Sequence, residues 1–125
     1  MPENKIAEKL FGILEEIDCC TKEQQDLFYS FLENQLELTK IFISKQLDYG
    51  PGNIAKFGEI GTIIRMNDKF ERLMNLTLHG SEAKNESIED TYKDISVYAI
   101  IALLCRVGAW PGARKLLIRS CEEAA

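Results

Sequence analysis

The chain has 125 residues, which is enough for one domain with a substantial hydrophobic core and too few for two domains of ordinary size. Its 46% of hydrophobic and 28% of charged residues are usual for a protein that folds in water, and no apolar run reaches the length of a membrane span. The formal net charge of -5 argues against a general nucleic-acid-binding protein, which is usually basic. We therefore expect a single domain over residues 1–125 that does not enter a membrane.

The first half of the chain predicts two amphipathic helices. The first covers Glu3 to Asp18, where apolar residues recur on one side. Thr21 and Gln24 form a capping box that opens a longer helix, which ends near Leu47. We expect the apolar side of this long helix to lie inside the fold; it comprises Leu27, Phe28, Phe31, Leu32, Leu38, Ile41 and Phe42.

A tight turn separates the long helix from the next one. Two glycines flank a proline in Asp48-Tyr49-Gly50-Pro51-Gly52-Asn53, and this composition is typical of a turn. A third helix follows from about Gly58 or Ile60 to Leu76. The apolar residues that we expect it to bury are Ile63, Ile64, Met66, Phe70, Leu73 and Leu76.

Four charged residues of the third helix share one face, because Arg65, Asp68, Lys69 and Arg72 are spaced at i, i+3, i+4 and i+7. Two arrangements fit this spacing. The face can be a solvated outer surface on which Asp68 pairs with Arg65 or Arg72. Alternatively, it can turn towards the acids of residues 86–94, which would place cations beside carboxylates in a pocket suited to a phosphate held through a metal.

The segment from Glu86 to Arg106 predicts one helix with an acidic first half and an apolar second half. We expect the apolar second half to be buried. Glu86, Asp90 and Asp94 lie on the stripe that apolar residues continue. Capping by Ser87 and the helix dipole explain the acids of the first turn. They do not explain Asp94 in the second turn, for which we expect a role as a ligand or in a buried ion pair.

The remaining segments are connectors and a last helix. A polar connector, Thr77 to Asn85, contains the single histidine, His79, which we expect on the surface rather than in a zinc site. Gly108 ends the acidic and apolar helix, and Pro111 can start another that runs to about Glu123. Alternation typical of strands is absent. The sequence therefore predicts an all-α bundle of about five helices.

The cysteines bear on the cellular compartment. Cys19, Cys20, Cys105 and Cys121 contain no C-x-x-C pair, and vicinal cysteines are a poor basis for a disulfide framework. The N-terminal residues are amphipathic and acidic, unlike a signal peptide. We therefore expect reduced thiols and a cytoplasmic location.

Several of these motifs together resemble the nucleotide modification associated domain 1 family, which is common in phage and bacterial genomes. The resemblance covers roughly residues 37–106. It consists of Lys45, Asp48-Tyr49-Gly50 and Asn53, then Arg65-x-x-Asp68-Lys69-x-x-Arg72-Leu73-x-Asn75-Leu76, then Glu86-Ser87-Ile88-Glu89-Asp90-Thr91-x-x-Asp94-x-x-x-Tyr98-Ala99. Its helical pattern relates the family to the all-α nucleoside triphosphate pyrophosphohydrolases, which include MazG and the dimeric dUTPases.

The resemblance implies specific roles for these residues. In the related enzymes, E-x-x-E and E-x-x-D motifs on helices hold magnesium against a triphosphate and activate a water at the α-phosphorus. The implied catalytic residues are Asp90 and Asp94 in the second motif and Asp68, with Glu71, in the first. The implied metal ligands are Asp90, Asp94 and Glu86, and the metal is Mg²⁺ or Mn²⁺. The implied nucleotide-binding residues are Lys45, Arg65, Lys69 and Arg72 at the phosphates, and Asp48, Tyr49 and Asn53 towards the base or sugar.

This sequence departs from the motifs of the related enzymes in two ways. Asp90 and Asp94 are four residues apart rather than three, and Asp68-x-x-Glu71 replaces a pair of glutamates. Three functions remain open. The first is a Mg²⁺-dependent pyrophosphohydrolase of (deoxy)nucleotide metabolism or modification, and the second is a nucleotide-binding accessory module without turnover. The third is an oligomerising helical protein with structural salt bridges. We expect a homo-oligomer, a dimer or tetramer, under all three.

Overall fold

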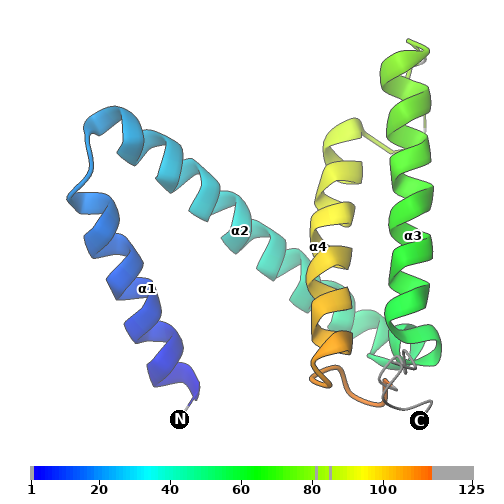
Figure 1. Cartoon of the computed structure of the whole chain (residues 1–125), viewed down its shortest axis with the longest axis horizontal. Coiled ribbons are helices and arrows are strands. Elements are labelled where there is room, and N and C mark those ends of the chain that lie inside the picture. The colour runs from blue at the N-terminus through cyan, green and yellow to red at the C-terminus, as the bar shows by residue number, and fades with distance from the viewer. Residues whose placement is uncertain (1, 81, 85, 114–125) are drawn as a thin grey trace, which may run out of the picture. The chain divides into compact units, whose positions relative to one another are not determined.

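The computed structural model describes residues 2–80, 82–84 and 86–113, and within these residues the chain is all-helical with no strand. The helices are α1 (Pro2–Asp18), α2 (Lys22–Tyr49), α3 (Gly52–Leu78) and α4 (Ile88–Arg106) (Figure 1). The predicted all-α class is therefore confirmed. The predicted last helix lies outside the described residues from residue 114 onward.

The ends of the helices follow the capping signals of the sequence. The hydroxyl of Thr21 accepts a hydrogen bond from the amide of Gln24 at 3.3 Å, and the Gln24 side chain accepts one from the amide of Thr21 at 3.0 Å. This reciprocal pair is a complete capping box at the start of α2. Ser87 caps α4 by accepting from the amide of Asp90 at 3.0 Å. Gly108, which follows the end of α4, has a φ of 76° that favours glycine.

The chain divides into two compact units, Met1–Ile41 and Phe42–Ala125, and α2 contributes to both. In the first unit, α1 and the first turns of α2 are joined by polar contacts. The Tyr29 hydroxyl donates to Asp18 Oδ1 at 2.7 Å, and the Gln25 amide group donates to the carbonyls of Asp18 and Cys20 at 3.1 and 3.2 Å.

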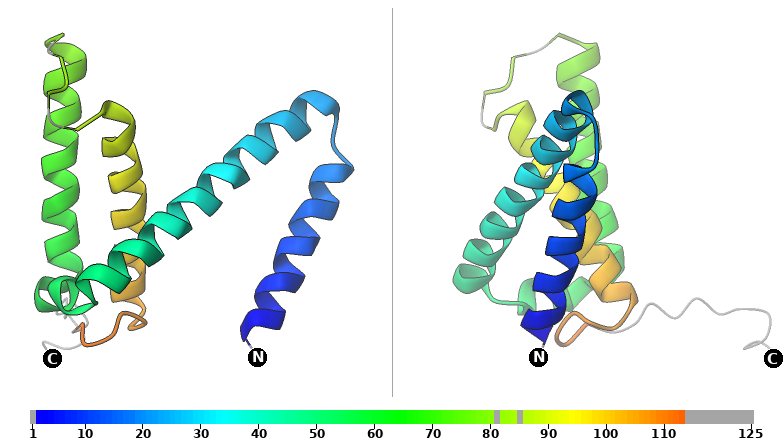
Figure 2. Two further views of the ribbon diagram at one scale, coloured as in Figure 1. Left: turned by 180° about the vertical axis from the view of Figure 1, so that it is seen from behind. Right: turned by 90° about the vertical axis from the view of Figure 1, so that its left-hand side faces the viewer.

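The second unit is built on an antiparallel pair of helices, α3 and α4, which lie side by side in every view (Figures 1 and 2). Its core consists of Ile54, Ile101, Cys105 and Trp110. The Trp110 indole packs edge-on against Phe42, with ring centroids 6.0 Å apart, and donates to the carbonyl of Pro51 at 3.0 Å. Trp110 thus connects the segment after α4 to the turn before α3.

Helix α3 is kinked at Gly58, where φ is 60° and ψ is -146°. This backbone conformation is essentially restricted to glycine. The next residue, Glu59, is buried and accepts a hydrogen bond from Nε of Arg106 at 2.8 Å. The buried hydroxyl of Thr62 donates to the carbonyls of Gly58 and Glu59. The sequence places the start of this helix at Gly58 or Ile60; the helix instead begins at Gly52, and Gly58 divides its first turns from the rest.

Many apolar residues that the sequence places in the core are exposed, and these predictions are wrong for the chain by itself. Helix α2 has no buried side chain. The exposed fractions include 65% for Leu27, 66% for Phe31, 52% for Phe70 and 58% for Leu103. The other residues concerned are Phe28 on α2, Ile63 and Ile64 on α3, and Tyr92 and Ile100 on α4. In α3 and α4 the cause is geometric, because these residues lie on the side of each helix that faces away from the other.

Two further expectations concern the environment of the protein. Among the described residues, no helix combines the length and the apolar character that a membrane crossing requires. Cys19, Cys20 and Cys105 are free thiols, whereas Cys121 lies outside the described residues. Burial raises the pKa of the Cys105 thiol, and the charge of Glu59 raises it further, so this thiol stays protonated and packs as an apolar group.

The kink at Gly58 leads to a test of stability. We predict that Gly58→Ala lowers the free energy of unfolding by about 1–3 kcal/mol, because an alanine is strained at this φ and ψ. Gly52→Ala is the matched control, since a Cβ there meets no atom within 4 Å and its φ is not positive. Urea unfolding followed by the fluorescence of Trp110 measures both variants. Equal stability of the two variants would contradict the kinked geometry.

Candidate functional site

The charged face of α3 turns towards the acids at the start of α4, so the second of the two arrangements predicted from the sequence is confirmed for Lys69 and Arg72. Nζ of Lys69 lies 2.9 Å from Oδ2 of Asp94 and 2.9 Å from Oε2 of Glu86. Nζ of Lys45, from the last turns of α2, lies 3.5 Å from Oδ1 of Asp94. We call these five residues, Lys45, Lys69, Arg72, Glu86 and Asp94, the polar cluster.

Lys69 is the central cation of the polar cluster because two carboxylates share its ammonium group. The exposed side-chain fractions are 22% for Lys69, 27% for Glu86 and 23% for Asp94, so the three groups are largely shielded from solvent. Glu86 belongs to the connector that precedes α4, whereas Asp94 lies in the second turn of that helix. The ammonium of Lys69 therefore links α3 to both the connector and α4.

Arg72 fixes the polypeptide that carries Glu86. Its guanidinium donates to the backbone carbonyl of Glu86, to the hydroxyl of Thr91 and, at 3.5 Å, to the carbonyl of Ser87. Thr91 is fully buried, and its hydroxyl donates a hydrogen bond to the Ser87 carbonyl at 3.1 Å. Planar guanidinium groups are suited to several simultaneous hydrogen bonds. Arg72 consequently holds the start of α4 against α3.

The electrostatics of the polar cluster keep its central groups charged. Partial burial acts to raise the pKa of Asp94, but hydrogen bonds with Lys69 and Glu86, and the charges of Lys69 and Lys45, lower it overall. Partial burial acts to lower the pKa of Lys69, but its hydrogen bonds to Asp94 and Glu86, and their charges, raise it overall. Near neutral pH, Asp94 is therefore a carboxylate and Lys69 an ammonium.

The other predicted site residues lie around the polar cluster. Asp90 is exposed, one helical turn before Asp94 on α4, and its amide is capped by Ser87. Asp68 is exposed on α3, about 100° around the helix from Lys69. The structure does not show the predicted pairing of Asp68, since Arg72 bonds to the start of α4 and Arg65 to Asn53.

The predicted nucleotide-binding residues outside the polar cluster fall into two pairs. Arg65 Nη2 donates to Oδ1 of Asn53 at 3.4 Å, which joins α3 across its kink. Asp48 and Tyr49 are exposed in the last turn of α2, and Tyr49 keeps 73% of its surface accessible. Among the described residues, no hydrogen bond joins the side chains of Asp48 and Tyr49 to the polar cluster. Their roles stay predictions.

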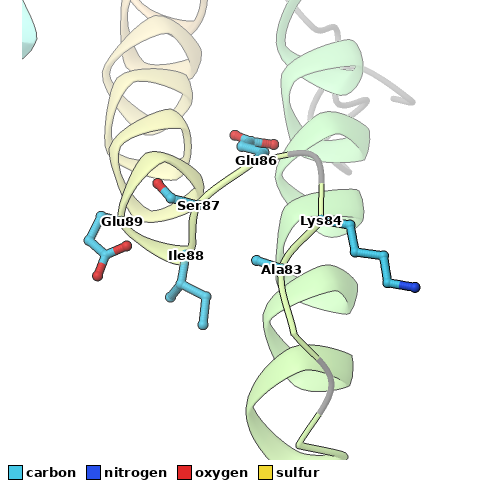
Figure 3. Close-up of a pocket in the computed structure, with 6 residues that line it drawn as sticks. All are labelled: Ala83, Lys84, Glu86, Ser87, Ile88 and Glu89. Carbon is cyan, nitrogen blue, oxygen red and sulfur yellow. The ribbon is translucent and has the colours of Figure 1, made fainter.

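An open hollow of about 420 Å³ adjoins the polar cluster at the connector. It is lined by Ala83, Lys84, Glu86, Ser87, Ile88 and Glu89 (Figure 3). Glu86 lies on the segment that crosses from α3 to α4, whereas Lys84 and Glu89 point outward in opposite directions (Figure 3). Glu86 is the residue common to the hollow and the polar cluster.

Sequence reasoning missed two buried polar contacts of this unit. The ion pair of Glu59 with Arg106 joins residues 47 positions apart, and no short motif signals it. Thr91 is completely buried under Arg72, and its position on the same side of α4 as Asp94 was the available signal. Within the described ranges, no group of three or more His, Cys, Asp or Glu residues is arranged to hold a metal ion.

Comparison of the chain with protein-family models, with curated proteins and with solved structures gives no match. The site is therefore interpreted from its own chemistry.

The shifted pKa values predict how Asp94 contributes to stability. We expect Asp94→Asn to lower the free energy of unfolding by about 1–2 kcal/mol at neutral pH, between the values for exposed and for buried ion pairs. Because the folded pKa of Asp94 is below its ordinary 3.8, the contribution is complete above that value and is lost as the pH falls through the lowered pKa. For Lys69, whose pKa is raised above 10.5, the contribution is lost as the pH rises through the raised value.

Urea unfolding monitored by circular dichroism across the pH range measures this difference between wild type and Asp94→Asn. Asp26→Asn is the control, because Asp26 forms an ion pair with Lys22 at 2.6 Å but both side chains are mostly exposed. We expect the control to change stability by less than about 0.5 kcal/mol at every pH. A deficit of Asp94→Asn that persists unchanged to about pH 2 would contradict the ion pair.

Proposed function

We propose that the protein binds a nucleoside triphosphate at the polar cluster and acts as a Mg²⁺-dependent pyrophosphohydrolase of (deoxy)nucleotide metabolism or modification. One observation carries the proposal: cations from α2 and α3 and carboxylates from the connector and α4 meet at one partly exposed place. This composition suits a highly charged ligand that travels with a metal. A salt-bridged outer face, the alternative for the same residues, would have left the cations of α3 pointing to solvent.

The cations of the polar cluster supply the contacts to phosphate. Lys45 is the most accessible of them, with 56% of its side chain exposed, and its ion pair with Asp94, at 3.5 Å, is longer than the 2.9 Å ion pairs of Lys69. An exposed ammonium on a flexible stem can turn from one oxygen anion to another at little cost. Arg72 is anchored to the start of α4, so its guanidinium presents a fixed positive charge. Lys45 is therefore the first group that an incoming phosphate would meet.

The carboxylates fit a Mg²⁺ ion that arrives with the triphosphate. Proteins often hold Mg²⁺ through one or two carboxylates and the phosphates of the substrate rather than through a complete cage of side chains. Glu86 and Asp94 converge on a single cation, the ammonium of Lys69, and Asp94 remains ionised near neutral pH. Two carboxylates that already face one positive charge are the donor set that such an ion needs. When bound, Mg²⁺ would neutralise part of the triphosphate charge and lower the pKa of a coordinated water.

The chemistry expected of the chain itself is proton transfer and alignment. In pyrophosphohydrolysis, a water oxygen bonds to the α-phosphorus, the bond from that phosphorus to the bridging oxygen breaks, and pyrophosphate leaves. Asp90 is exposed and one turn from Asp94, so its carboxylate is available to accept the proton of the water. Lys45 and Lys69 would offset the charge that develops on the departing pyrophosphate.

A second function is favoured by the position of Lys69. Because its ammonium is already paired with Glu86 and Asp94, the polar cluster can hold phosphates through its cations without engaging a metal. The protein would then be a nucleotide-binding accessory module without turnover. The two functions differ in whether nucleotide binding requires a divalent ion.

Thermal shift with a panel of nucleoside mono-, di- and triphosphates, each with Mg²⁺ and with EDTA, tests nucleotide binding. We expect one triphosphate to raise the melting temperature only with Mg²⁺. Lys45→Met should weaken that binding about tenfold, the loss of roughly one charge-assisted contact. Lys22→Met is the matched control, since Lys22 forms a similar exposed ion pair on the first unit. Stabilisation by a nucleotide in the presence of EDTA would support the accessory module. If no nucleotide changes the melting temperature, the ion pairs have a purely structural role.

Release of pyrophosphate from the triphosphate identified in this way tests hydrolysis. We expect Asp94→Asn and Asp90→Asn to lower kcat by about 100-fold or more, the usual effect of removing a catalytic acid or base. Glu89→Gln, on the exposed side of α4, is the control and should retain the wild-type rate. If Asp94→Asn and Asp90→Asn fold normally and keep full activity, the assignment of both residues is wrong.

We also propose that the functional form is a homo-oligomer. The outer sides of α3 and α4 carry ten large apolar side chains that are each about half exposed or more: Ile60, Ile63, Ile64, Phe70, Met74, Leu78, Tyr92, Ile100, Leu103 and Val107. At roughly 150–200 Å² per side chain, they present on the order of 800 Å² of apolar surface, as much as one partner buries in a stable interface. The two stripes point away from each other, and this favours a tetramer or an interlocked dimer.

Analytical ultracentrifugation of the full chain checks the oligomeric state. We expect a dimer or tetramer at micromolar concentration, and Leu103→Glu should shift it to smaller species because a charge in an apolar interface is costly. Lys84→Glu, which places a new carboxylate on the exposed connector, should leave the assembly unchanged. A wild-type chain that stays monomeric at high concentration would contradict the proposal.

A further inference from the structure

The ammonium of Lys69 lies at the point on which two carboxylates of the polar cluster converge. It is 2.9 Å from Oδ2 of Asp94, 2.9 Å from Oε2 of Glu86 and 3.2 Å from the second Glu86 oxygen. All three side chains keep less than a third of their surface exposed. A divalent ion cannot bind Glu86 and Asp94 together while this positive charge lies between them.

We propose that Lys69 is a resident cation that keeps the carboxylates from binding metal until a polyphosphate draws its ammonium away. The freed Glu86 and Asp94 then take the divalent ion, so polyphosphate and metal bind cooperatively. This inference rests on the proposed function of the same site. It adds to that function that the two ligands depend on each other: neither the metal alone nor the polyphosphate alone binds well.

Unpaired charge in a shielded place is the physical cause of the coupling. With Lys69 and Lys45 in place, two positive charges balance the two carboxylates, which therefore repel an added phosphate less than bare carboxylates would. Once a phosphate holds the ammonium, Glu86 and Asp94 are left partly buried without the cation that they share, which is unfavourable. A divalent ion restores the balance. The coupling is reciprocal, because the same free energy appears in the affinity of either ligand when the other is bound.

The neighbouring cations cannot play this part. Arg72 is anchored by hydrogen bonds to the backbone of Glu86 and Ser87 and to the hydroxyl of Thr91, so its guanidinium cannot leave without releasing the start of α4. Lys45 contacts the other oxygen of Asp94, at 3.5 Å, and does not lie between the two carboxylates. Lys69 has a flexible four-carbon stem and a compact charge, which allow it to exchange one oxygen anion for another.

Titration of the full chain with Mn²⁺ alone, by calorimetry or by the electron paramagnetic resonance of free Mn²⁺, tests the inference. We expect wild type to bind Mn²⁺ weakly and Lys69→Met, which keeps the apolar stem, to bind it at least tenfold more tightly. Lys45→Met removes an equal charge beside Asp94 and should gain less than threefold. Adding Glu86→Gln to Lys69→Met should abolish the gain, which identifies the ligands. A Lys69→Met variant that folds but gains no affinity for Mn²⁺ would overturn the inference.

A second measurement on the wild-type chain covers the case in which Lys69→Met does not fold. Inorganic tripolyphosphate is added, and Mn²⁺ binding is compared at equal free Mn²⁺ concentration with and without it. Cooperative binding predicts an increase in Mn²⁺ affinity within the range of 5- to 150-fold that is typical of coupled sites. Equal Mn²⁺ affinity with and without tripolyphosphate would overturn the inference.

The outcomes distinguish this inference from the proposed function. If a nucleotide stabilises wild type but Lys69→Met gains no Mn²⁺ affinity, the resident-cation inference fails and nucleotide binding stands. If Lys69→Met gains Mn²⁺ affinity but no nucleotide binds to wild type, the metal site on Glu86 and Asp94 stands and the proposed function fails.

Discussion

The second unit depends on one shared charge, the ammonium of Lys69 between Glu86 and Asp94. Near the connector, α3 contributes the buried Leu73 and Leu76 beside the charged groups of the polar cluster, and at the opposite end Ile54, Ile101 and Cys105 pack together. Without Lys69, two carboxylates would meet in a place that is largely shielded from solvent, which is unfavourable. The proposed binding of a metal and a polyphosphate rests on the same shared charge that permits this close approach.

The α3–α4 pair is unusual for a helical hairpin because its charged residues point inward at one end while large apolar side chains point outward along both helices. In a chain that folds alone, apolar stripes would face the neighbouring helix. The inner faces of the two helices are occupied by the polar cluster and by the buried core, so the apolar residues of the outer faces remain exposed. These exposed outer faces are the basis of the proposed homo-oligomer, in which other helices would cover them.

Local signals in the sequence predicted the helices and part of the site. The capping box of Thr21 and Gln24 and the cap provided by Ser87 are local, because donor and acceptor lie three residues apart. From the row of cations on α3, one of the two predicted arrangements had Lys69 and Arg72 facing α4.

The features that the sequence did not predict depend on contacts between distant residues or on the backbone conformation. The partner of Glu59 is 47 residues away, and the kink at Gly58 cannot be distinguished from an ordinary helical glycine by pattern alone. Amphipathic patterns also do not say which chain covers an apolar stripe, and for this reason the predicted burial of Phe31 and Leu103 was wrong for the single chain.

The most direct test of the central claim is to locate the bound ligand by NMR, with ¹⁵N-labelled full-length protein, Mg²⁺ and inorganic tripolyphosphate. If the polar cluster is the phosphate site, the amides of Lys69 and Arg72 and those of residues 86–94 should shift together, while amides of the first unit should stay in place. Shifts confined to residues 48–53, or the absence of any shift at saturating tripolyphosphate, would contradict the claim that the polar cluster binds phosphate.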